Sequence, residues 1–122
     1  MNNQFIIALL ILFFSNVYVC CATDQLQADI NEIYDSSYPL DEKIALLEQL
    51  EKNSKDALKR KSLGLLYHKL GRLYSGKNQQ KAIEYFEKAL DIRLSSESKD
   101  ILAANQSRFS LSVVYGRLGE KE

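Results

Sequence analysis

Residues 70–90 read LGRLYSGKNQQKAIEYFEKAL and carry the strongest pattern in the chain. The first half places a small residue between two large ones on one helical stripe: Leu70, Gly71 and Tyr74. The second half places an aromatic ring between two small residues on one helical face: Ala82, Phe86 and Ala89. A glycine in such a stripe lets a neighbouring helix approach closely, and residues three or four apart share a face. The stretch therefore predicts two helices that pack against each other around a tight turn.

The same pattern recurs on both sides of this stretch at nearly equal intervals. Leu111 opens a copy of the first-helix pattern with Ser112 as its small residue, and Ile30 opens a weaker copy. Where the clear unit has its Ala, Phe and Ala, the upstream copy has Lys43, Leu47 and Leu50. The interval is about 40 residues, which suits a repeat of two helices and two turns, whose apolar faces are buried only when units stack.

These residues resemble the signature of the tetratricopeptide repeat, a Leu-Gly pair and Tyr followed by Ala, Phe and Ala. The period exceeds that of the standard unit and is similar to the longer units of motor-protein light chains and bacterial regulatory proteins. The resemblance implies an all-α fold in which α-hairpins stack as a short right-handed solenoid. It covers residues 23–122, or about two and a half units.

The resemblance also implies a function, namely a non-enzymatic scaffold that binds a peptide or a partner helix. First-helix side chains of this family line a concave groove that binds the partner. The resemblance implies no cofactor and no metal. The aligned groove positions are Leu65, His68, Arg72, Ser75, Gln106, Phe109, Val113 and Arg117. The chaperone-binding members use Lys and Asn where this chain has His68 and Arg72, which speaks against a C-terminal EEVD-like ligand.

Caps and breakers predict where the helices begin and end. We expect helices over residues 24–34, 41–52, 55–75, 79–94 and 99–118. Pro39 disfavours helix at the residue before it, and Asp41 is the expected cap of the second helix. Gly76 is expected to end the third helix.

The segment over residues 1–22 differs in kind from the rest. Phe5 to Phe14 is an uninterrupted apolar run, and no charged side chain precedes Asp24. This length is typical of a signal-peptide core, and cleavage after Ala22 fits the small-residue rule. We therefore expect an apolar leader helix over residues 1–22, removed on export to give a periplasmic or secreted protein. An uncleaved membrane anchor through residues 5–22 is the alternative, and lipid attachment at Cys20 or Cys21 is a weaker one.

Charge is balanced overall but divided along the chain. The 16 Lys and Arg residues equal the 16 Asp and Glu residues, so no global basic footprint for nucleic acid exists. Residues 24–51 hold eight acids and one Lys, whereas residues 52–81 hold nine bases and one Asp. The basic block is interpreted either as a docking face for an acidic peptide or an anionic surface, or as the complement of the acidic unit beside it that otherwise faces solvent. The second interpretation is favoured, because surface charge blocks are usually solvated.

No catalytic constellation is apparent. His68 is the single histidine, and one histidine does not make a multi-histidine metal site. An ordinary exposed position is the expectation for it, with ligand contact as the alternative. Ser107, Ser110 and Ser112 have no accompanying base in the sequence pattern.

The last predicted helix is followed only by Gly119 and three charged residues, where a repeat array would continue with another helix. We therefore expect either a fragment of a longer protein or an open C-terminal face that serves for docking or self-association. The alternative function is correspondingly the extracytoplasmic sensory region of a truncated signalling protein.

Overall fold

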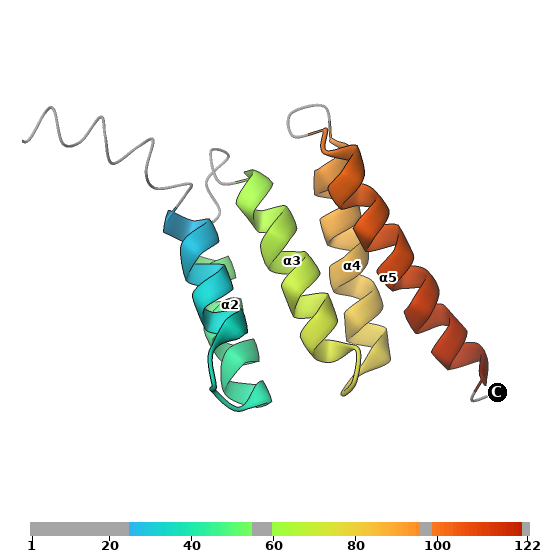
Figure 1. Ribbon diagram of the computed structural model, residues 1–122, viewed down its shortest axis with the longest axis horizontal. Coiled ribbons are helices and arrows are strands. Elements are labelled where there is room, and N and C mark those ends of the chain that lie inside the picture. Colours follow the sequence, from blue (N-terminus) through green and yellow to red (C-terminus); the bar gives the residue numbers. More distant parts are fainter. Residues whose placement is uncertain (1–24, 55–59, 96–98, 121–122) are drawn as a thin grey trace, which may run out of the picture.

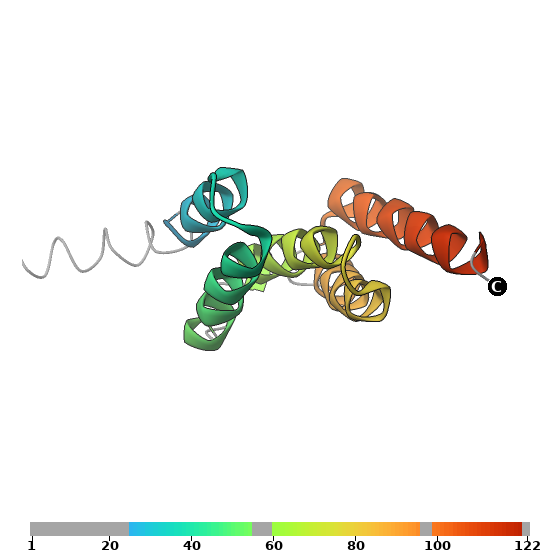
Figure 2. The same ribbon diagram turned by 90° about the horizontal axis from the view of Figure 1, so that it is seen from below.

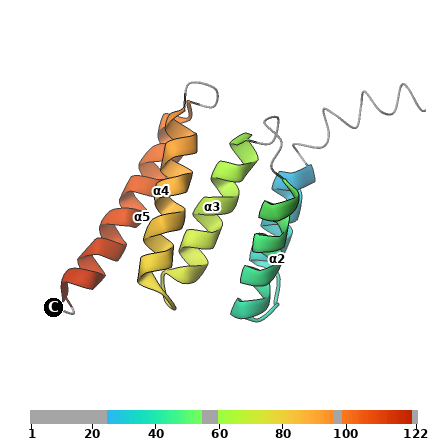
Figure 3. The same ribbon diagram turned by 180° about the vertical axis from the view of Figure 1, so that it is seen from behind.

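The computed structural model describes residues 25–54, 60–95 and 99–120, and these residues are all-α. A helix over residues 25–35 is followed by α2 (Leu40–Asn53), α3 (Arg60–Tyr74), α4 (Gln79–Leu94) and α5 (Ile101–Glu120). The helices lie side by side in chain order (Figure 1), and the view from behind gives the same order (Figure 3). The predicted all-α class is confirmed. The expected leader over residues 1–22 lies outside the described residues.

The helices form two layers about α3. Seen from below in Figure 2, the helix over residues 25–35 and α5 lie on one side, and α2 and α4 lie on the other. α3 packs most extensively on α4, α4 packs next on α5, and α2 packs on α3. α3 therefore contacts both the first half of the chain and the second.

Helix starts follow side-chain caps in α4 and α5 but not in α2. The side chain of Asn78 accepts a hydrogen bond from the backbone N–H of Lys81 at 3.1 Å, and Asp100 accepts one from Ala103 at 3.1 Å. In α2 the N-cap is Pro39, which makes no side-chain cap bond. The expectation that Asp41 caps α2 is wrong, because Asp41 lies inside the first turn. Its carboxylate there still faces the positive end of the helix dipole.

The end of α3 also differs from expectation. The helix ends at Tyr74, and the turn that follows is closed by backbone hydrogen bonds from Lys77 and Asn78 to the carbonyl of Tyr74. Gly76, which was expected to end the helix, lies in this turn with a negative φ and so does not form a left-handed cap. Two N–H donors satisfy the final carbonyl without a left-handed residue.

The α3–α4 contact is as close as the glycine pattern predicts. Phe86 is 1% exposed, and a Cβ placed on Gly71 would lie 2.7 Å from two carbons of its ring. Ala82 and Ala89, one turn on either side of Phe86, are fully buried with Leu70. The large ring thus fills the space that the glycine leaves, which fixes the distance between the two helices.

Equivalent positions of the repeat are buried alike in the core but differ in exposure on α5. Ile30, Leu70 and Leu111, which are equivalent in the internal spacing, are all buried. Ser112 and Tyr115 are exposed, although their counterparts Gly71 and Tyr74 are buried. No further helix of the described residues packs against α5 on that side.

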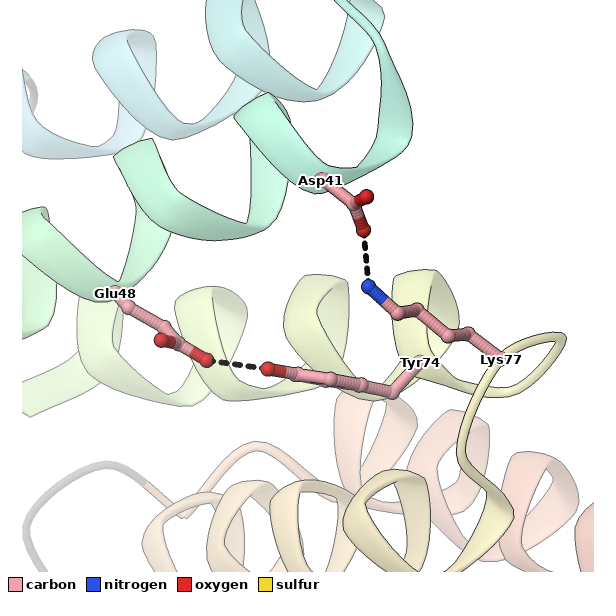
Figure 4. A network of polar contacts seen from close by, with 4 residues as sticks. All are labelled: Asp41, Glu48, Tyr74 and Lys77. Atoms are coloured by element: carbon pink, nitrogen blue, oxygen red, sulfur yellow. Dashed lines mark hydrogen bonds and ion pairs between the residues drawn. The ribbon is translucent and has the colours of Figure 1, made fainter.

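α2 is attached to α3 and α4 largely by acceptor carboxylates and donor hydroxyls. The hydroxyl of Tyr74 donates to Glu48 at 2.6 Å, and that of Tyr85 donates to the same oxygen at 3.3 Å. Lys77 forms an ion pair with Asp41 across the same interface (Figure 4). Asp41, Glu48 and Glu51 of α2 therefore have partners within the fold. Their main partners are tyrosines, which the expected pairing of charge blocks did not include.

None of the helices in the described ranges has the length and hydrophobicity that crossing a membrane requires.

Candidate functional site

A cleft of about 880 Å³ opens between the helix over residues 25–35, α3 and α5, with Phe86 of α4 at its floor. Its walls are α3, α5 and the helix over residues 25–35, the last two of which lie on the same side of α3 in Figure 2. All eight residues aligned as groove positions line this one cleft: Leu65, His68, Arg72, Ser75, Gln106, Phe109, Val113 and Arg117. The structure thus brings the set together. Contact with a ligand stays a prediction for each of them.

Helical periodicity explains why these side chains converge. Leu65, His68, Lys69 and Arg72 follow one another at helical spacing and form one stripe of α3. Ser75 continues the stripe beyond the last turn, where its hydroxyl donates to the carbonyl of Arg72 at 2.8 Å. This bond holds the end of the wall in position.

The α5 wall exposes apolar surface toward the cleft. Phe109 is 70% exposed and Val113 is 36% exposed, and both line the cleft with Gln106 and Arg117. Val114, on the adjacent stripe, is buried against the core and orients the helix. Exposed large apolar side chains in a concave site are typical of a surface that a partner covers.

His68 is buried, so the expectation of an ordinary exposed histidine is wrong. Its ring lies 5.3 Å from that of Phe86, and its Nδ1 lies 3.2 Å from the hydroxyl oxygen of Ser107. Burial, followed by the positive charges of Arg93, Arg72 and Lys69, lowers the pKa of His68 to about 3. The imidazole is therefore neutral near pH 7, and it is a buried polar group in the lining of the cleft.

Ser107 and Arg93 complete a buried polar network that the sequence pattern did not reveal. Arg93 donates to the Ser107 hydroxyl at 2.8 Å and to the carbonyl of Ala103 at 2.9 Å. Ser107 does have a histidine beside it, contrary to expectation, but it is fully buried and so is not an accessible nucleophile. The available signal was Arg93 itself, which continues the buried stripe of Phe86 and Ala89 at helical spacing.

The cleft is positively charged. Lys69, Arg72 and Arg117 line it, and none of its described lining residues is Asp or Glu. On the opposite wall the ring of Tyr34 lies 4.1 Å from the Lys69 nitrogen and 5.8 Å from the Arg72 guanidinium carbon. Burial, then the charge of Arg72, lowers the pKa of Lys69. Sequence reasoning missed Tyr34 and Lys69, although Tyr34 is the counterpart of Tyr74 in the weak first copy.

Within the ranges that the structure describes, no group of three or more His, Cys, Asp or Glu residues is placed to hold a metal ion.

Comparisons of the chain with protein-family models, with curated proteins and with solved structures find no match.

Proposed function

We propose that this protein is a non-enzymatic scaffold that binds a peptide or a partner helix in the cleft. One observation carries the proposal: the eight residues of two separate helices that align with groove positions of the tetratricopeptide repeat line a single cleft. Helical periodicity explains why each set of four shares a face, and the cleft forms where the two faces meet. The proposal extends to the architecture, a short right-handed stack of α-hairpins of the tetratricopeptide kind, which the buried equivalents Ile30, Leu70 and Leu111 support.

The chemistry of the lining suits a polypeptide ligand. Phe109 and Val113 offer apolar area whose burial would favour binding by about 25 cal/mol per Å². Gln106 and Asn105 offer amide donors and acceptors for the ligand's backbone. A groove with apolar anchors and a few convergent polar groups is the common form of a peptide site.

The test is capture of partners by the full chain and by the double variant Arg72→Glu with Phe109→Ala. These two substitutions change both walls of the cleft but neither side chain lies in the core. Partners bound by the wild type should be lost from the double variant, while circular dichroism shows the same helicity.

The matched control is Lys88→Glu with Leu102→Ala. It makes the same kinds of change at exposed positions of α4 and α5 that do not line the cleft. Retained binding by the cleft variant, or equal loss in the control, would remove the cleft from the proposed function.

A further inference from the structure

We propose that the cleft selects an acidic segment of a partner protein. Carboxylates of that segment would meet Lys69, Arg72 and Arg117, and an apolar side chain would pack on Phe109 and Val113. This inference rests on the proposed function and adds the chemical class of the partner.

The two cations of the α3 wall lie near one aromatic ring. The side-chain nitrogen of Lys69 lies 4.1 Å from the centre of the Tyr34 ring, and the Arg72 guanidinium carbon lies 5.8 Å from it. A third cation, Lys43 of α2, lies 5.9 Å from the same ring but outside the cleft lining, and it donates to the carbonyl of Tyr34 at 2.7 Å. The quadrupole of one ring attracts cations but cannot neutralise two of them. Like charges held this close repel one another, and an anion bound between them would relieve the repulsion.

Carboxylates of the described residues place little negative charge beside these cations. None of the described carboxylates forms an ion pair with Lys69, Arg72 or Arg117. Asp35 is near enough to favour the charged form of Lys69, but Arg72 opposes it more strongly. Three acids of α2, which would be natural counter-charges, are bonded to tyrosines or to Lys77 at the other interface: Asp41, Glu48 and Glu51. Arg117 adds a further positive charge on the α5 wall.

Apolar surface beside the cations favours an acidic peptide over a polyanion. A phosphate backbone would be bound by cations alone, whereas Phe109, which lines the same cleft as the three cations, is 70% exposed. A segment in which carboxylates alternate with Leu or Phe satisfies both features at once. Complementary charge of this kind would mainly increase the association rate and the selectivity.

The experiment measures binding of short labelled peptides to the full chain by fluorescence anisotropy. One peptide alternates Asp or Glu with Leu and Phe, a second replaces its acids by Lys, and a third replaces its apolar residues by Ser. The first should bind about tenfold more tightly than either of the others. Its affinity should fall as salt rises, because the Debye length is about 10 Å at 0.1 M and shorter above that.

Single substitutions then locate the site. Arg72→Gln and Arg117→Gln should each weaken binding of the acidic peptide about fivefold, and Lys88→Gln should leave it unchanged. Phe109→Ser should weaken it, while Leu102→Ser, on the same helix and 80% exposed, should not. Equal loss with Lys88→Gln, with unchanged helicity in all variants, would overturn the inference.

Other outcomes are also decisive. Tighter binding of the Lys peptide, lost on Phe109→Ser, would overturn the acidic selectivity and leave the proposed scaffold function standing. Binding of a single-stranded oligonucleotide or of anionic lipid vesicles in place of the acidic peptide would assign the cations to a different ligand. Self-association of the chain that the acidic peptide does not displace would assign the cleft to a second copy. Failure of every peptide, together with unchanged partner capture by the double variant above, would remove the proposed function as well.

Discussion

The two sides of α3 use charge in opposite ways. Toward α2, Tyr74 and Tyr67 donate hydrogen bonds to Glu48 and Glu51, and every charged group named there has a partner. Toward the cleft, Lys69 and Arg72 are held near one ring without an ion pair among the described residues. The chain as a whole is neutral, so the difference is one of placement. Acids on the first side accept hydrogen bonds within the fold, whereas Lys69 and Arg72 on the second form no ion pair among the described residues.

Gly71→Ala should have the largest effect on stability. The added methyl group would push α3 away from α4 and so disturb the contacts on both sides of α3. The new Cβ would lie 2.7 Å from carbons of the Phe86 ring, which is 1% exposed, so the ring or the helix must shift. We expect a loss of about 1–3 kcal/mol in the free energy of unfolding, measured by urea titration.

Gly116→Ala is the matched control, since a Cβ there meets nothing within 4 Å. In a helix interior this substitution should stabilise the protein by about 0.5–1 kcal/mol. The same sign for both variants would show that α3 and α4 are not in close contact at Gly71.

Tyr74→Phe should destabilise the protein next most, by about 1.5 kcal/mol, because it leaves a charged acceptor short of a donor. It removes the 2.6 Å bond to Glu48, which then keeps only the longer bond from Tyr85. Tyr85→Phe, which removes that 3.3 Å bond, should cost less. Both losses are measured by urea titration. Binding of the acidic peptide should be unchanged in both variants if the two sides of α3 act independently.

His68, buried beneath the cleft, should make the free energy of unfolding depend on pH. Its folded pKa of about 3 lies below the ordinary 6.5, so between these values the unfolded chain binds one more proton than the folded chain. The free energy of unfolding therefore falls as pH drops from 6.5 toward 3, by at most about 1.4 kcal/mol per pH unit. His68→Asn, which keeps a polar atom near Ser107, should lose this part of the pH dependence.

The difference between the wild-type and His68→Asn profiles is the quantity to measure, because carboxylates also titrate in this range. Parallel profiles would contradict the buried, neutral histidine.

The smallest effects concern the exposed charges. Lys77→Gln should cost about 0–1 kcal/mol, and less at high ionic strength, because its ion pair with Asp41 is exposed to solvent. Arg72→Gln should change stability by less than about 0.5 kcal/mol at low salt, since it removes no ion pair. A larger loss in Arg72→Gln than in Lys77→Gln would show that the cleft cations are structural.

The elements of this fold could be predicted from spacing, whereas its polar contacts could not. Leu70, Gly71, Phe86 and the two alanines predicted the α3–α4 contact because size and helical period dictate it. The groove positions were assigned by the resemblance to the tetratricopeptide repeat; helical spacing explains why the members on one helix share a face, and the packing of α3, α4 and α5 brings the two faces together. Arg93, His68 and Ser107 meet only through packing of three helices, so the position of Arg93 on the buried stripe of α4 is the one local signal and does not identify its partners. Tyr34 was missed as a wall of the cleft because the first copy of the repeat is weak.

The most direct test of unequal charge on the two sides of α3 is an NMR titration of the full chain with the acidic–apolar peptide. We predict chemical-shift changes at Lys69, Arg72, Phe109 and Arg117 and none at Tyr67, Tyr85 or Lys88. Changes confined to the tyrosine side, or equal changes with the Lys peptide, would contradict the account.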